Sequence, residues 1–211
     1  MKLLINDSPP SEHEPLTRFG GFPAVPDKGS VEWPGCRACN GPMQFLGQLR
    51  VPASSETAER LLLIFMCQNE PGMCDEWEAD NGGNSVLVID ASQSMKLLQP
   101  PVISPATIRG AVNGALFVES EVDDYDLARE EWANAHDNRR REVLGQVSGP
   151  PSWIQAGEVP ACNACSTPMR FVAQLEEGPG HETAMNFGGG CAYVFDCSCD
   201  SPTGKLLWQC G

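Results

Sequence analysis

Basic residues are scarce in this chain of 211 residues, which holds 14 Lys and Arg against 28 Asp and Glu. The formal net charge is −14 and the sequence pI is about 4.5. A surface of this sign repels phosphate backbones and anionic lipid head groups. We therefore expect neither a nucleic acid nor a membrane as a partner. A basic protein or peptide segment is the partner that the charge favours, although the same charge also serves solubility alone.

Long hydrophobic runs are also missing. The apolar stretch near the N-terminus covers only Leu3 to Ile5, whereas a signal-peptide core needs about 7–15 residues. No segment approaches the roughly 20 consecutive apolar residues of a transmembrane helix. These absences predict a cytoplasmic protein. In a reducing compartment, paired cysteines bind metal or carry out redox chemistry more often than they form structural disulfides.

Candidate catalytic groups are few. The three histidines, His13, His136 and His181, lie far apart in the sequence, and none is next to a plausible nucleophile. The acidic run from Glu119 to Asp126 matches no calcium-loop spacing, and a solvated helix entry is the better interpretation of it. We therefore expect a protein that is not an enzyme.

A stretch of 14 residues occurs twice, as CRACNGPMQFLGQL at 36–49 and as CNACSTPMRFVAQL at 162–175. Eight of the 14 positions are identical, all at the constant offset of 126 residues that separates Cys36 from Cys162. The chain is therefore internally duplicated. Each copy opens with a C-x-x-C pair, a spacing at which one tight turn presents two sulfur atoms to one metal ion.

A second cysteine pair follows each C-x-x-C pair, after a short apolar run that predicts an inner strand. Four cysteines complete a tetrahedral site, and four thiolates suit zinc. We predict two structural zinc sites, one for each copy: Cys36, Cys39, Cys67 and Cys74 in the first, and Cys162, Cys165, Cys197 and Cys199 in the second. In the second site, Cys191 or Cys210 is an alternative to Cys199.

The C-x-x-C pairs also permit a redox interpretation. Thioredoxin-type chemistry places this motif at the start of a helix in a βαβ unit. Here Pro42 and an alternating strand pattern follow the first pair instead, and Pro168 follows the second in the same way. For this reason a thiol-based redox or metal-sensing protein is the second hypothesis, ranked after a protein with structural zinc sites.

The chain has 21 glycines and 18 prolines, which predict many turns and short strands. We expect an α+β, β-rich fold with an extended lead-in over 1–16, a first repeat over 17–93, a connector and helix over 94–141, and a second repeat over 142–211. Alternating or apolar patterns predict strands over 43–49, 61–67, 85–89, 169–175, 192–197 and 205–209.

Two further elements are expected outside these strands. A glycine turn at Gly20 and Gly21 opens the first repeat, and its counterpart is Ser148 and Gly149, which requires a two-residue gap because the offset there is 128. A helix is predicted over 124–136, with acidic residues in its first turn. One face of it, formed by Tyr125, Ala128, Glu131 and Trp132, is expected to lie against a sheet.

The order of Gly-Gly-x-Pro, C-x-x-C-x-x-P-M-x-F-x-x-Q-L and a strand that ends in cysteine resembles the YwqG-like family of uncharacterised bacterial proteins. The segments 153–155, 168–175, 188–195 and 207–210 carry this resemblance. The chain is also similar, more distantly, to eukaryotic programmed cell death protein 2 and its relatives. The resemblance implies a duplicated β-rich fold without an established enzyme activity.

The eukaryotic relatives are thought to act as chaperones for a small-subunit ribosomal protein, and some YwqG-like proteins occur among toxin–antidote gene clusters. Together with the residues, this resemblance leads to one hypothesis. We expect a non-enzymatic, zinc-stabilised, intracellular module that binds a protein or peptide, in a role like that of a chaperone or an antidote.

Overall fold

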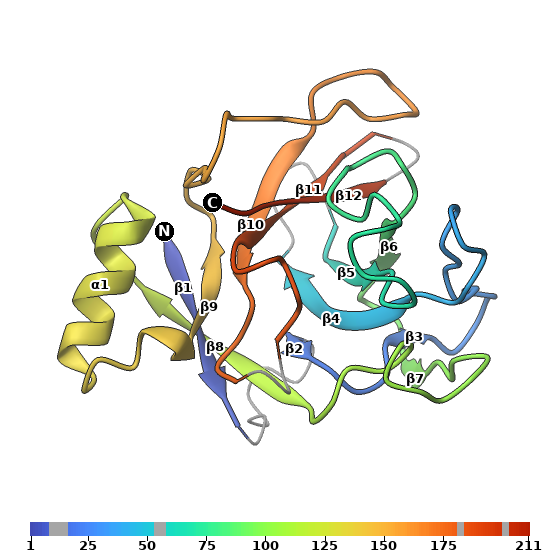
Figure 1. Ribbon diagram of the computed structural model, residues 1–211, viewed down its shortest axis with the longest axis horizontal. Coiled ribbons are helices and arrows are strands. Elements are labelled where there is room, and N and C mark those ends of the chain that lie inside the picture. Colours follow the sequence, from blue (N-terminus) through green and yellow to red (C-terminus); the bar gives the residue numbers. More distant parts are fainter. Residues whose placement is uncertain (9–16, 53–57, 181–183, 200–202) are drawn as a thin grey trace.

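The computed structural model describes residues 1–8, 17–52, 58–180, 184–199 and 203–211. Its main feature is a closed barrel of ten strands (Figure 1). In their order around the barrel, these strands are β1 (Lys2–Asp7), β8 (Asn113–Glu119), β2 (Arg18–Phe19), β4 (Gln44–Val51), β5 (Arg60–Met66), β6 (Asn84–Asp90), β12 (Gly204–Gln209), β11 (Cys191–Asp196), β10 (Arg170–Glu176) and β9 (Val143–Val147). Two short strands, β3 (Ala24–Pro26) and β7 (Met95–Leu97), form a separate sheet.

The six strands expected from the sequence are all confirmed, with ends that differ by a few residues. Every residue of β5 and of β11 is buried. Their inward side chains join the barrel core, while their outward side chains lie under an outer apolar cluster. This double burial explains why both strands are continuous apolar runs rather than alternating ones.

The duplication is visible in the backbone. The strands β4, β5 and β6 form one antiparallel meander, and β10, β11 and β12 form another. The pairing of β4 with β5 shifts register between Phe45 and Gly47, and that of β10 with β11 shifts between Phe171 and Ala173. These positions are 126 residues apart, so the repeat preserves a β-bulge as well as a sequence.

The two repeats share one barrel because their leading strands are exchanged. The first strand, β1, pairs with β9 of the second repeat, whereas β8 pairs with β2 of the first repeat. The strands β1 and β8 also pair with each other. The expected lead-in and connector thus each supply a barrel strand; residues 9–16 of that lead-in lie outside the described residues.

Two buried glutamines attach the segments that lead to the C-x-x-C pairs. The side-chain oxygen of Gln48 accepts a hydrogen bond from the backbone N–H of Ala24, at 2.9 Å, and that of Gln174 accepts one from Ser152, also at 2.9 Å. Ala24 and Ser152 are 128 positions apart, which agrees with the two-residue gap. At the turn, Ser148 adopts a φ of 63°, close to the 75° of Gly20.

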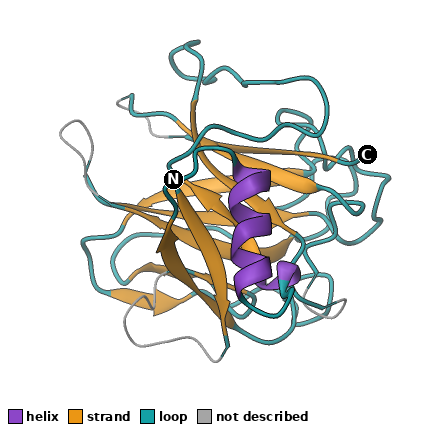
Figure 2. Cartoon of the chain, turned by 90° about the vertical axis from the view of Figure 1, so that its left-hand side faces the viewer, coloured by secondary structure: helices purple, strands orange, loops and turns teal. Residues whose placement is uncertain are grey.

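The predicted helix is confirmed as α1 (Tyr125–Ala135), which lies along the outside of the barrel (Figure 2). The side chain of Asp124 caps its first turn by accepting a hydrogen bond from Leu127 N–H, at 2.9 Å. Tyr125 and Ala128 pack on β1 and β9 as expected. Glu131 is exposed, contrary to the predicted face, and Ala133 takes the buried place. None of the described helices is long and apolar enough to cross a membrane.

A charged network lies at one end of the barrel. Asp196, at the end of β11, is fully buried between two arginines. Its carboxylate accepts a bond from Arg60 Nη2 at 2.7 Å, and bonds from Arg170 Nε at 3.0 Å and Nη2 at 2.9 Å. All three charges lie at the end of the barrel where β5 and β10 begin and β11 ends, and their bonds are of the charge-assisted kind.

Candidate metal centres

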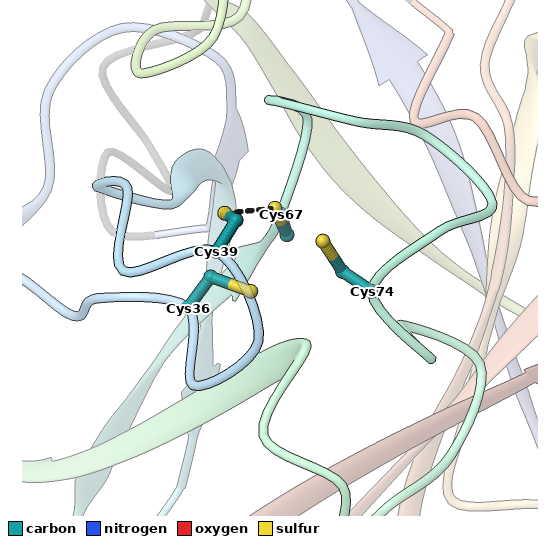
Figure 3. Close-up of side chains that lie close together, drawn as sticks. All are labelled: Cys36, Cys39, Cys67 and Cys74. Atoms are coloured by element: carbon teal, nitrogen blue, oxygen red, sulfur yellow. Dashed lines mark hydrogen bonds between the residues drawn. The ribbon is translucent and has the colours of Figure 1, made fainter.

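The first centre comprises Cys36, Cys39, Cys67 and Cys74, whose sulfur atoms all lie within 4.8 Å of one another. The C-x-x-C pair precedes β4, Cys67 directly follows β5, and Cys74 lies in the loop between β5 and β6. Figure 3 shows the four cysteine side chains gathered together. The Sγ atoms of Cys39 and Cys67 are 3.7 Å apart. Strand pairing between β4 and β5 thus brings the late cysteines beside the early pair, as the sequence predicted.

The second centre comprises Cys162, Cys165, Cys197 and Cys199, again with sulfur atoms within 4.8 Å of one another. The Sγ atoms of Cys165 and Cys197 are 3.5 Å apart, and those of Cys162 and Cys199 are 3.9 Å apart. All ten cysteines of the chain are free thiols. Each four-cysteine group could therefore hold a metal ion.

The alternative ligands proposed for the second centre lie elsewhere. Cys191 is buried at the start of β11, where its thiol donates to the Tyr193 hydroxyl at 3.3 Å and accepts from Gln174 Nε2 at 3.4 Å. Cys210 follows β12 and is half-buried. Among the described residues, neither joins a four-cysteine group.

The C-x-x-C turns have the same backbone in both copies. In the first turn, Cys36 N–H donates to Gly41 O at 2.8 Å, and Asn40 N–H donates to Cys36 O at 2.9 Å. The second turn repeats both bonds, from Cys162 to Thr167 and from Ser166 to Cys162, at 2.9 and 2.8 Å. Asn40 and Ser166 have φ values of 59° and 60°. This left-handed residue reverses the chain, so both cysteines of the pair face one point.

Polar groups around the sulfur atoms differ between the centres. In the first, Asn69 Nδ2 lies 3.5 Å from the sulfur of Cys39 and 3.4 Å from that of Cys67. In the second, the Thr203 hydroxyl lies 3.3 Å from Cys162 Sγ, and the Thr167 hydroxyl lies 3.0 Å from Cys165 Sγ. Such donors stabilise thiolates and orient ligands around a metal. Sequence reasoning missed all three residues, because nothing in a lone Asn or Thr indicates a neighbouring sulfur.

Within each centre the thiol pKa values move in opposite directions. Hydrogen bonds from the Thr203 hydroxyl and from backbone amides lower the pKa of Cys162 to about 6. The backbone amide of Cys199 also lowers the pKa of Cys197. Burial and the neighbouring sulfurs outweigh this effect, so the pKa of Cys197 rises to about 12. In the first centre, the backbone amide of Gly41 lowers the pKa of Cys39, whereas burial raises that of Cys74. Four sulfurs this close cannot all carry charge without a cation among them.

The two centres differ in exposure. In the first, Cys36, Cys67 and Cys74 are buried and Cys39 is half-buried. In the second, Cys165 is exposed and Cys199 is half-buried. The second centre is therefore the more accessible to solvent and to reagents.

The loop that carries Cys74 connects the two centres. Arg37, inside the first C-x-x-C pair, donates through Nη1 to the backbone oxygen of Asp80 at 3.2 Å. The side chain of Asp80 accepts a bond of 2.5 Å from Lys205, whose ammonium also donates to Asn163 Oδ1 at 2.8 Å. Because Asn163 lies inside the second C-x-x-C pair, one chain of contacts joins both turns.

No family model matches the sequence, and no curated protein matches it either. The function is therefore inferred from the geometry of the two centres and from the surface of the chain.

Proposed function

We propose that this protein is a zinc-stabilised, non-enzymatic module that binds a protein partner in the cytoplasm. The observation that carries the zinc assignment is the spacing of the sulfur atoms. A tetrahedral zinc ion about 2.3 Å from each thiolate sets neighbouring sulfurs about 3.8 Å apart. The close pairs of the two centres, at 3.7, 3.5 and 3.9 Å, agree with that edge length.

A structural role follows from the number of ligands. Four cysteine sulfurs occupy all the positions of a tetrahedral ion, so no position stays open for a water or a substrate. Each proposed ion would tie a C-x-x-C turn to the end of an inner strand and to the following loop. Binding of a structural zinc ion contributes about 10–16 kcal/mol in small zinc modules, which is as large as the whole stability of an ordinary domain.

A protein partner is supported by charge and by exposed apolar side chains. The net charge of −14 favours a basic segment. Among the described residues, three of the eight large hydrophobic side chains that are exposed lie within one seven-residue stretch of the connector: Leu97, Val102 and Ile103, at 52%, 59% and 71% exposure. Exposed apolar groups that occur together are typical of interaction surfaces. A chaperone-like or antidote-like role, as implied by the resemblance to YwqG-like proteins, is part of this proposal.

Affinity capture from a cytosolic extract with three forms of the zinc-loaded protein tests the partner. The forms are the wild type, the double variant Val102→Ser with Ile103→Ser, and the control Leu127→Ser, which changes an exposed apolar residue of α1. We expect a basic protein that the wild type and the control retain and the double variant loses. Salt should weaken its binding, because exposed charges are screened. The proposal is refuted if no protein is captured specifically, or if the protein turns over a small substrate instead.

A thiol-based redox or metal-sensing role is the second candidate, and the exposure of Cys165 in the second centre favours it. This role predicts that cysteines of the metal-loaded protein react readily with an alkylating agent. Closed structural sites predict resistance until a chelator is added. Mass spectrometry of alkylated peptides distinguishes the two candidates residue by residue.

A further inference from the structure

One end of the barrel contains a cavity of about 590 Å³ that the proposed zinc sites do not use. Its volume is within the range of small-molecule sites. Five barrel strands contribute to it, through the start of β1 and β10 and the ends of β4, β8 and β9. The lining residues are Lys2, Leu49, Arg50, Val51, Pro52, Phe117, Val147, Ser148, Arg170, Phe171 and Val172.

The deep part of the cavity is apolar. Leu49 and Val172 belong to the buried core of the barrel, and Val51, Phe117 and Val147 pack against that core while staying partly accessible. An apolar group that enters the cavity would therefore continue the packing of the barrel interior. Such a group gains free energy roughly in proportion to the apolar area it removes from water.

Every charged residue in the lining is a cation. Lys2, Arg50 and Arg170 keep 43%, 37% and 50% of their side-chain surface exposed. Each is ion-paired: Lys2 with Glu119 at 3.0 Å, Arg50 with Glu59 at 2.6 Å, and Arg170 with Asp196 at 2.9 Å. These carboxylates lie outside the lining, and no carboxylate among the described residues lines the cavity. Three cations around one apolar opening stand out in a chain whose net charge is −14. Their field would attract an anion to this opening and repel a cation.

Arg170 is held in place by the structure. Its guanidinium donates two bonds to the buried carboxylate of Asp196, which also binds Arg60. A guanidinium fixed in this way loses little side-chain entropy when a ligand arrives. Arg60 and Arg170 share the single carboxylate of Asp196, whereas Lys2 and Arg50 each pair with one carboxylate, so these ion pairs together leave a formal charge of +1 at this end of the barrel.

We propose that this cavity binds a small amphiphilic anion, with its apolar chain on Leu49, Phe117 and Val172 and its anionic head at Lys2 and Arg170. A medium-chain carboxylate has this chemistry. The shape and the charge of the cavity carry this proposal, and it does not depend on whether zinc occupies the cysteine centres or on the protein partner.

Fluorescence titration with 8-anilinonaphthalene-1-sulfonate, itself an amphiphilic anion, tests the proposal on the full chain. We expect saturable binding at one site, displaced by decanoate but not by decyltrimethylammonium, which has the same chain length and the opposite charge. The variants Arg170→Gln and Lys2→Gln should each weaken decanoate binding about tenfold, because each removes a charged partner. The matched control is Lys28→Gln, which removes an exposed cation outside the cavity and should bind as the wild type does.

Four outcomes would overturn the proposal. The first is an absence of saturable binding by the folded wild type. The second is equal displacement by the two detergents, and the third is an unchanged affinity in both cavity variants when thermal unfolding shows that they are folded. Binding of an acidic peptide without binding of decanoate would assign the cavity to a protein partner and would also overturn it.

Discussion

The substitution Asp196→Asn removes the carboxylate charge that lies between Arg60 and Arg170 at the barrel end. The Asp196 side chain is 0% exposed and that of Arg60 is 8% exposed, so both members of this pair are buried away from bulk water. Removing one partner of a buried ion pair costs about 3–5 kcal/mol, because the remaining charge stays desolvated. A domain of this size loses about 2–4 °C of melting temperature for each kcal/mol. We therefore expect a decrease of about 6–20 °C.

The matched control is Arg170→Gln. The Arg170 side chain is 50% exposed, and its removal leaves the pair of Arg60 and Asp196 intact. An exposed partner contributes about 1 kcal/mol or less. Calorimetry and chemical unfolding at saturating zinc would compare the two variants with the wild type. If Asp196→Asn lowers the melting temperature no more than Arg170→Gln does, the reasoning from burial is wrong.

The remaining predictions concern contacts between the two repeats and within the second. Asp80→Ala leaves the Lys205 ammonium, which is 6% exposed, without its carboxylate partner. We expect the free energy of unfolding to fall by about 1.5–3 kcal/mol. We also expect a chelator to remove zinc from the second centre faster than it does in the wild type. An unchanged rate would show that the connecting loop does not support that centre. Gln174→Leu leaves the Ser152 N–H without its acceptor. A denaturant titration should show a decrease of about 1–3 kcal/mol in the free energy of unfolding. A decrease below 0.5 kcal/mol, roughly the smallest net value of one hydrogen bond, would refute this prediction.

The parts of the fold that the sequence predicts are those set by local patterns and by the repeat. The apolar runs predict β5 and β11, and the segment of alternating apolar residues after each C-x-x-C pair predicts β4 and β10. The grouping of the cysteines also follows from the sequence, because adjacent antiparallel strands return the chain to the first pair. The capping residue Asp124 and the acidic first turn fix the start of α1.

The parts that the sequence does not reveal depend on pairing between distant segments. The strand β1 is short, and its apolar centre, Leu3 to Ile5, gives no sign that it joins β8 and β9 more than 100 residues later. The strand β9 contains Gly145, and glycine is a residue that argues against a strand in a sequence pattern. Glycine is required at this position because a Cβ atom there would lie 1.9 Å from Gln174 O. The contact of Asp80 with Lys205 likewise has no local signal.

The central claim is that two zinc ions hold the two halves of the barrel, each in four cysteine sulfurs. Native mass spectrometry of the protein purified without added metal tests it most directly. We expect two zinc ions in the wild type and in the control Cys210→Ser, and one in Cys74→Ser and in Cys199→Ser. A wild type that carries no zinc and takes up none when zinc is added would contradict the account, and so would a Cys199→Ser variant that keeps both ions.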